Sequence, residues 1–211
     1  HKLGTQMKAT GEVMSVGRTF EESLLKAIRS LETGVNHLYM HKFKTEETDS
    51  LMDYIKIGTD DRIYAIAELL RRGCEVSVIA AETRIDRFFL DKMQKIVDME
   101  KELKQCLGDK TVLYQAKKMG FSDKAIAWLW DKKETDIFKM RKDAHIFPVY
   151  KMIDTCASEF ESYVPYFYST YEIENESVIE DRKKIIVLGS GPIRIGQGVE
   201  FDYSTVHAVK T

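Results

Sequence analysis

The chain has 211 residues, of which 44% are hydrophobic and 31% are charged, and its formal net charge is -2. This composition is typical of a folded protein of one or two domains. The small net charge argues against a protein that binds polyanions, and no apolar run approaches the roughly 20 residues that a membrane-spanning helix needs. We therefore expect a soluble protein that contacts neither nucleic acid nor membranes.

The cysteines indicate the compartment. Cys74, Cys106 and Cys156 lie far apart, and an odd number cannot form a complete set of intrachain disulfides. This pattern favours a reducing, cytoplasmic location. The chain starts with a histidine instead of a methionine and carries nothing that resembles a signal peptide. We interpret it as an internal piece of a longer protein.

Amphipathic patterns predict helices over most of the chain. Thr19 and Glu22 form a capping box, which predicts a helix that runs to about Thr33. The strongest pattern covers residues 83–108, where apolar residues recur at intervals of three, four or seven, and it predicts one long helix. Further short helices are predicted before Gly58, from Asp60 or Asp61 to Gly73, after Asp109 as far as Gly120, after Ser122, and around Ile137 and Met140. Short connections favour a compact antiparallel bundle.

The pattern changes after Pro148. Residues 149–153 and 163–171 are rich in β-branched and aromatic side chains, which predicts an extended connector. Residues 184–188 then form a short apolar run that ends at Gly189, and a helix is predicted from about Phe201. The expected fold is mainly α: a helical bundle followed by the first strand, loop and helix of a truncated α/β domain.

The loop after the apolar run is rich in glycine but matches neither common nucleotide-binding fingerprint. The dinucleotide pattern G-x-G-x-x-G needs glycine where Arg194 stands, and the P-loop needs lysine where Gln197 stands. Pro192 also removes a backbone donor from the loop. These departures disfavour a dinucleotide-dependent oxidoreductase, the alternative enzyme class for a strand followed by a glycine-rich turn.

Residues 189–198, Gly-Ser-Gly-Pro-Ile-Arg-Ile-Gly-Gln-Gly, with Val-Glu-Phe-Asp-Tyr directly after them, resemble the start of the second half of the carbamoyl phosphate synthetase large subunit. Earlier segments resemble that family in the same order, namely residues 6–14, 17–19, 85–90, 150–160 and 168–172. Each segment alone is a weak signal. Together they extend the resemblance over nearly the whole chain.

The resemblance implies a particular place in a larger enzyme. In that family two homologous ATP-grasp halves are joined by a helical oligomerisation domain. Residues 1–32 would then end the first synthetase unit, residues 33–182 would form the oligomerisation domain and connector, and residues 183–211 would open the second-half (pre-ATP-grasp) domain. The parent enzyme makes carbamoyl phosphate from bicarbonate, glutamine-derived ammonia and two ATP, for arginine and pyrimidine biosynthesis. It uses ATP with Mg²⁺ or Mn²⁺, associates with a glutaminase small subunit, and self-associates through the helical domain.

The same resemblance places the chemistry outside this chain. The carboxylates and the asparagine that hold the metal ions of an ATP-grasp site have no counterpart here, so we expect no catalytic, cofactor-binding or metal-binding residues and no turnover. Glu12 and Arg18 are the nearest candidates for a catalytic role, and surface charge is the commoner explanation for such residues. His37 and His41 have the i, i+4 spacing of zinc ligands, but no third ligand is near.

One loop is a candidate site by resemblance alone. Arg194, Gly196, Gln197 and Gly198 would line the internal tunnel that carries carbamate between active sites, where bulky side chains would close the channel. A tight structural turn explains the same glycines equally well. Both interpretations stay open at the level of sequence.

Two surface features invite binding hypotheses. Trp128 and Trp130 cannot both face the same side of a helix, so one of them is expected to be exposed and available to a partner. The apolar stripes in general are explained by the core of the bundle. A basic cluster suggests nucleic-acid binding, but interspersed carboxylates make this unfavourable. The cluster comprises Lys132, Lys133, Lys139, Arg141 and Lys142, and the carboxylates are Asp131, Glu134, Asp136 and Asp143.

Overall fold

The computed structural model describes residues 13–154, 156, 159–160, 166–187 and 206–211. Its main body is helical and is followed by one pair of strands, so the mainly α prediction is confirmed. No helix in this part of the chain is long and apolar enough to cross a membrane. The helices are α1 (Phe20–Ser30), α2 (His41–Lys44), α3 (Thr48–Ile55), α4 (Arg62–Arg71), α5 (Val76–Thr83), α6 (Arg87–Gln105), α7 (Lys110–Lys118), α8 (Asp123–Trp130) and α9 (Glu134–Asp143).

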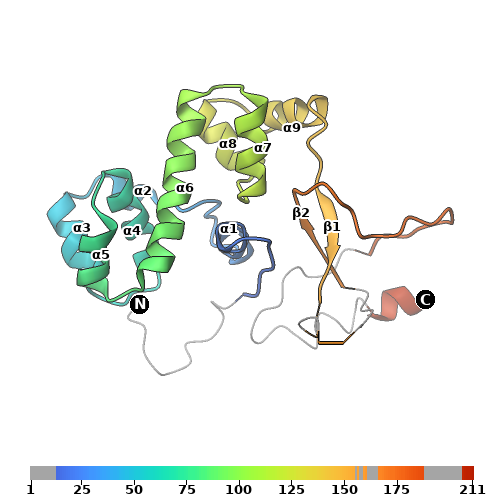
Figure 1. Ribbon diagram of the computed structural model, residues 1–211, viewed down its shortest axis with the longest axis horizontal. Coiled ribbons are helices and arrows are strands. Elements are labelled where there is room, and N and C mark those ends of the chain that lie inside the picture. Colours follow the sequence, from blue (N-terminus) through green and yellow to red (C-terminus); the bar gives the residue numbers. More distant parts are fainter. Residues whose placement is uncertain (1–12, 155, 157–158, 161–165, 188–205) are drawn as a thin grey trace.

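Helix α6 is the central element of the bundle. It runs between a group formed by α2 to α5 and a group formed by α7 to α9, while α1 lies against it on the side away from α2 to α5, below α7 and α8 in this view (Figure 1). Its apolar stripe explains this position, because Met93, Ile96 and Leu103 are buried in the core. Two other apolar residues of the predicted pattern, Phe89 and Leu107, are exposed.

The long helix begins later than the pattern predicts. Arg84 has a left-handed backbone with φ 56°, which ends α5, and the Asp86 carboxylate accepts a hydrogen bond from the Phe88 amide to start α6. Residues 83–108 therefore contain a helix end, a turn and a new helix instead of one continuous helix. The cap at Asp86 is the physical reason, because an aspartate at this position satisfies the first amide groups of a helix. The sequence prediction also missed the separate helices α2 and α5.

Other predicted caps are present. The Thr19 hydroxyl accepts a hydrogen bond from the Glu22 amide at 3.2 Å, although the Glu22 carboxylate accepts from the Arg18 amide and not from that of Thr19. Asp109 caps α7, and Ser122 caps α8 through the Ala125 amide at 3.0 Å. These side chains satisfy backbone amides that have no partner inside the helix, so they fix where each helix begins.

Gly120 brings α1 into direct contact with the turn between α7 and α8. Its φ of +94° suits glycine, and a Cβ atom there would lie 2.8 Å from the Cα atom of Glu22. The Arg29 guanidinium donates a hydrogen bond to the Gly120 carbonyl at 2.8 Å. Helix α1 is thus held against the α7–α8 turn by a close backbone approach and by a side-chain hydrogen bond.

The extended connector predicted after Pro148 is confirmed as an antiparallel hairpin. Strand β1 (Val149–Met152) pairs with β2 (Phe167–Thr170), with Val149 opposite Thr170. Residues 183–187 pair with no described segment, and Ile185 and Ile186 are 91% and 84% exposed. A β-strand needs neighbouring strands to satisfy its backbone hydrogen bonds. This apolar run has no such neighbour among the described residues. Residues 206–210, in the segment where a helix is predicted, are helical.

Candidate functional site

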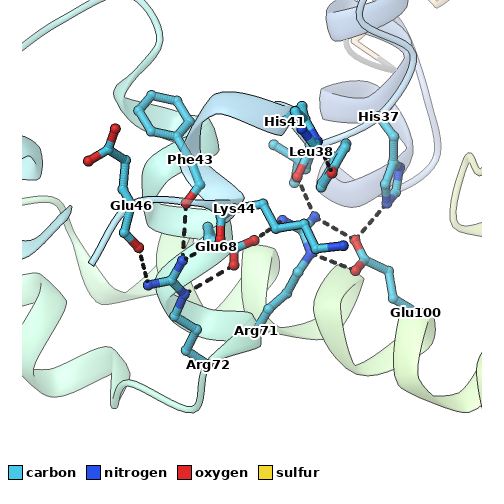
Figure 2. Close-up of polar contacts among 11 residues, drawn as sticks. His37, Leu38, His41, Phe43, Lys44, Glu46, Glu68, Arg71, Arg72 and Glu100 are labelled. Carbon is cyan, nitrogen blue, oxygen red and sulfur yellow. Dashed lines mark hydrogen bonds and ion pairs between the residues drawn. The ribbon is translucent and has the colours of Figure 1, made fainter. Parts of the chain in front are cut away.

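A buried ion-pair network joins α4, α6 and the segment that follows α1 (Figure 2). Arg71 on α4 forms a two-pronged ion pair with Glu100 on α6, with N···O distances of 2.7 and 2.8 Å. His37 contributes a third contact to the same carboxylate at 2.7 Å through Nε2. Arg71 also donates to the Leu38 carbonyl. The Glu100 side chain is only 2% exposed, so its carboxylate is desolvated, and both of its oxygens have hydrogen-bond partners.

The neighbouring arginine extends the network to the chain around α2. Arg72 pairs with Glu68 at 3.1 Å and donates to the carbonyls of Phe43 and Glu46 at 3.1 and 2.8 Å (Figure 2). Phe43 lies in the short helix α2 and Glu46 in the turn after it, where backbone carbonyls lack hydrogen-bond partners within the helix. The two adjacent arginines therefore fasten residues 38–46, which contain little regular structure, onto the bundle.

Electrostatics decide the protonation state of this network. Burial by itself would raise the pKa of Glu100, but the hydrogen bonds and charges of Arg71 and His37 outweigh burial and lower the pKa to about 2. The carboxylate is therefore ionised and accepts from His37, so the Nε2 atom of His37 carries the donated proton. The Nδ1 atom of His37 is buried without a hydrogen-bond partner in the described structure.

A second network joins α7, α8 and α9. The Asp123 carboxylate is shared by Lys117, at 2.7 Å, and by Arg141, at 3.0 Å. Lys117 also donates to the Phe121 carbonyl, and Arg141 donates to the Ile146 carbonyl. Two buried cations therefore share one carboxylate, which leaves a positive surplus inside this part of the bundle.

Exposed aromatic side chains occur at several places in the described chain, and two of these surfaces bear on partner binding. Trp128 is 47% exposed and lies against Tyr39, whereas Trp130 is buried and donates its indole N–H to the Leu103 carbonyl at 2.7 Å. The prediction that one tryptophan is exposed is thus confirmed. The other surface was not predicted: Phe88 and Phe89 are 52% and 44% exposed.

The residues singled out from the sequence lie mostly elsewhere. The loop residues Arg194, Gly196, Gln197 and Gly198, as well as Glu12, lie outside the described part of the chain. Arg18 is exposed, and a hydrogen bond with Tyr168 raises its pKa. His37 belongs to the Glu100 network, and His41 is exposed. Arg141 of the proposed basic cluster is buried in the second network, so it is not available to a nucleic acid.

Sequence reasoning missed both networks, although Glu100 gave a signal. It lies four residues after Ile96 and three before Leu103, so it occupies the apolar face of α6. A charged residue at a core position needs a partner of opposite charge. The partner, Arg71, lies 29 residues earlier, and nothing in the local pattern identifies it.

The chemistry open to these groups is limited. The described residues contain no group of three or more histidine, cysteine, aspartate or glutamate side chains that could hold a metal ion. Both networks act on turns and helix ends, and the exposed aromatic groups are of the kind found at protein interfaces. The fold and the two networks define a helical scaffold domain.

Comparison with protein families is consistent with this class. The family model of the carbamoyl-phosphate synthetase large chain, oligomerisation domain, matches residues 12–145, which is more than half of the chain. The model of the carbamoyl phosphate synthase preATP-grasp domain matches residues 181–211. The chain belongs to the family of carbamoyl-phosphate synthetase large chains, which are ATP-dependent ligases. Family membership implies ATP and Mg²⁺ for the complete enzyme, and the oligomerisation domain suggests self-association.

Proposed function

We propose that this chain is the joint between the two synthetase halves of a carbamoyl-phosphate synthetase large chain. The observation that carries the proposal is the order of the two family matches, a helical body followed by the opening of a preATP-grasp domain. The proposed units are residues 1–32, the end of the first synthetase unit; residues 33–182, the oligomerisation domain and connector; and residues 183–211, the start of the second-half domain.

In this proposal the chemistry belongs to the parent enzyme. That enzyme would make carbamoyl phosphate in the cytoplasm from bicarbonate, ammonia supplied by a glutaminase small subunit, and two ATP with Mg²⁺ or Mn²⁺, for arginine and pyrimidine biosynthesis. The chain itself would be inactive. An assay of bicarbonate-dependent ATP hydrolysis on the purified chain is expected to match a blank without protein. Turnover above that blank would overturn the assignment of catalysis to other parts of the enzyme.

Self-association is proposed to use the surface formed by Phe20, Phe88 and Phe89. The Phe20 ring lies 6.0 Å from that of Phe88 and 5.4 Å from that of Phe89, centroid to centroid, so the three form one cluster. An aromatic side chain covers roughly 150–250 Å² when buried, and folded monomers rarely leave such groups exposed together. The Lys92 ammonium lies 5.3 Å from the centre of the Phe88 ring, which gives the apolar cluster a charged edge. An apolar centre with a polar rim is the usual anatomy of an interface.

Sedimentation across a range of protein concentrations tests this surface. The unmodified chain is expected to form dimers or larger species as concentration rises, and the double variant Phe88→Ser with Phe89→Ser is expected to remain monomeric. Trp128→Ser is the matched control, because Trp128 is similarly exposed but lies on the other aromatic surface. A control that dissociates while the double variant still associates would move the interface to Trp128. A strictly monomeric unmodified chain would remove the claim of autonomous association.

The glycine-rich loop keeps its proposed role in the parent enzyme. If Arg194, Gly196, Gln197 and Gly198 line the carbamate tunnel, Gly198→Leu would narrow the channel. Glutamine-dependent synthesis by the complete enzyme is then expected to fall while the partial ATPase reactions continue. Unchanged coupling between the two activities would leave a tight turn as the explanation of the glycines.

A further inference from the structure

A pocket of about 260 Å³ lies between α1, the α7–α8 turn and strand β2. Helix α1 contributes Glu22, Lys26 and Arg29 to its wall. The opposite wall includes Lys117 of α7 and Tyr171, which follows β2. The close approach of α1 to the turn at Gly120 fixes the separation of these walls. The pocket is therefore built from three segments that are distant in sequence.

The carboxylates of this pocket are already engaged. Both oxygens of Glu22 have partners, the Lys26 ammonium at 2.8 Å and the Arg18 amide at 2.7 Å. Asp123 is shared by Lys117 and Arg141, as described above. Glu134 also lines the pocket but is exposed, so solvent screens its charge.

The pocket has three cations in its lining, Lys26, Arg29 and Lys117, against the two engaged carboxylates of Glu22 and Asp123 and the exposed Glu134. Arg141 holds Asp123 from outside the lining, so part of the negative charge of Asp123 is already neutralised there. Arg29 differs from the other cations because it forms no ion pair within the described chain. Its guanidinium donates a hydrogen bond to the neutral Gly120 carbonyl. A guanidinium carries five N–H donors, so donors of Arg29 remain for a ligand.

The pKa values of Arg29 and Lys117 reflect the cost of burying these two cations. Burial lowers the pKa of Arg29, and the nearby Glu22 charge compensates only in part. Burial also lowers the pKa of Lys117, with Arg141 and Arg29 contributing further through charge repulsion although Asp123 acts in the opposite direction. Desolvated cations without full compensation are costly, and a bound anion would relieve that cost.

We propose that this pocket binds a phosphate group of a small ligand through the remaining donors of Arg29, beside Lys26 and Lys117. A phosphate group offers several oxygen acceptors to the donors that Arg29 has left, and the planar guanidinium suits phosphate geometry. The ligand would touch α1, the α7–α8 turn and the segment after β2 together. It would thus tie the connector hairpin to the helical body, a role separate from the proposed self-association and independent of it.

Titration of inorganic phosphate into the 211-residue chain, followed by phosphorus NMR, tests the proposal. Ionic strength is held constant with sodium chloride, and acetate is titrated in parallel. Saturable phosphate binding is expected, with acetate weaker. Arg29→Gln, whose amide still reaches toward the Gly120 carbonyl, is expected to weaken binding by about tenfold because it removes a charge-assisted contact. Arg87→Gln, the same charge change at an exposed position on α6, is expected to alter binding by less than about twofold.

Circular dichroism of each variant checks that it is folded. If Arg29→Gln unfolds, Lys26→Gln provides the test, because it removes another cation that lines the pocket. Loss of binding in a folded pocket variant but not in Arg87→Gln supports the site. Binding that Arg29→Gln and Lys26→Gln leave unchanged, or that chloride reproduces at matched ionic strength, would mean an adventitious ion only and would overturn the proposal.

Discussion

The two buried networks use similar residues but differ in charge balance. In the first, Arg71 and Arg72 face Glu100 and Glu68, so two arginines meet two carboxylates. In the second, Lys117 and Arg141 share the single carboxylate of Asp123, which Arg29 does not reach.

The difference indicates different roles. A balanced network can be buried because each charge has a partner of opposite charge, and it can do no more than hold its segments together. The Glu100 network does this for the segment between α1 and α3, which contains the short helix α2. A network with surplus positive charge is stable only near solvent or near an added anion. The Asp123 network lies beside such an opening, at the side of the bundle that carries the connector.

Glu100→Ala should have the largest effect on stability. It leaves the Arg71 guanidinium buried with its carbonyl partner and with Glu68 at the longer distance of 3.5 Å, and it leaves His37 without its acceptor. Removing one partner of a buried ion pair costs about 3–5 kcal/mol. Urea unfolding measures the change in the free energy of unfolding. Glu102→Ala, an exposed site on the same helix, is expected to change it by less than about 0.5 kcal/mol.

Acid should remove the same contribution without a mutation. The pKa of Glu100 is lowered from 4.5 to about 2 in the folded state. Between these values the unfolded chain binds more protons, so stability increases with pH in this window. The stabilisation is complete above pH 4.5 and is lost as the pH falls toward 2, an effect of about 3 kcal/mol. The urea midpoints of the unmodified chain and of Glu100→Gln should therefore converge in acid, and parallel curves would contradict this.

The sequence predicted local features well and long-range partnerships poorly. The caps at Thr19, Asp109 and Ser122 were predictable because each acts on an amide two or three residues away. The start of α6 was missed because the apolar period continues through residues 83–86, and only the cap at Asp86 and the left-handed Arg84 interrupt it.

The candidate sites show the same difference between local features, which the sequence predicts, and contacts between distant residues, which it does not. The exposure of one of two alternate tryptophans follows from helical geometry, so it could be predicted. The Arg71–Glu100 pair and the cluster of Phe20 with Phe88 and Phe89 join residues that are distant in sequence, so only the folded chain brings them together.

Asp123→Asn should give the smallest loss of stability among these changes. It should also distinguish the Asp123 network most clearly from the Glu100 network. It keeps the shape of the side chain but removes the charge shared by Lys117 and Arg141, both of which retain carbonyl acceptors. The free energy of unfolding is therefore expected to fall by about 1–3 kcal/mol, less than for Glu100→Ala. Asp98→Asn, an exposed site on α6, serves as the control for the charge change.

Asp123→Asn also tests whether the Asp123 network only stabilises the fold or in addition forms one side of the proposed phosphate site. Neutralising Asp123 increases the positive surplus around Arg29, so phosphate affinity should rise by about two- to tenfold while stability falls. A network that only holds helices together predicts no gain in affinity. Stability and binding that move in opposite directions would thus be specific to the Asp123 network, since the Glu100 network is balanced and lies in another part of the bundle. A fall in both stability and phosphate affinity would instead mean that Asp123 only holds α7, α8 and α9 together.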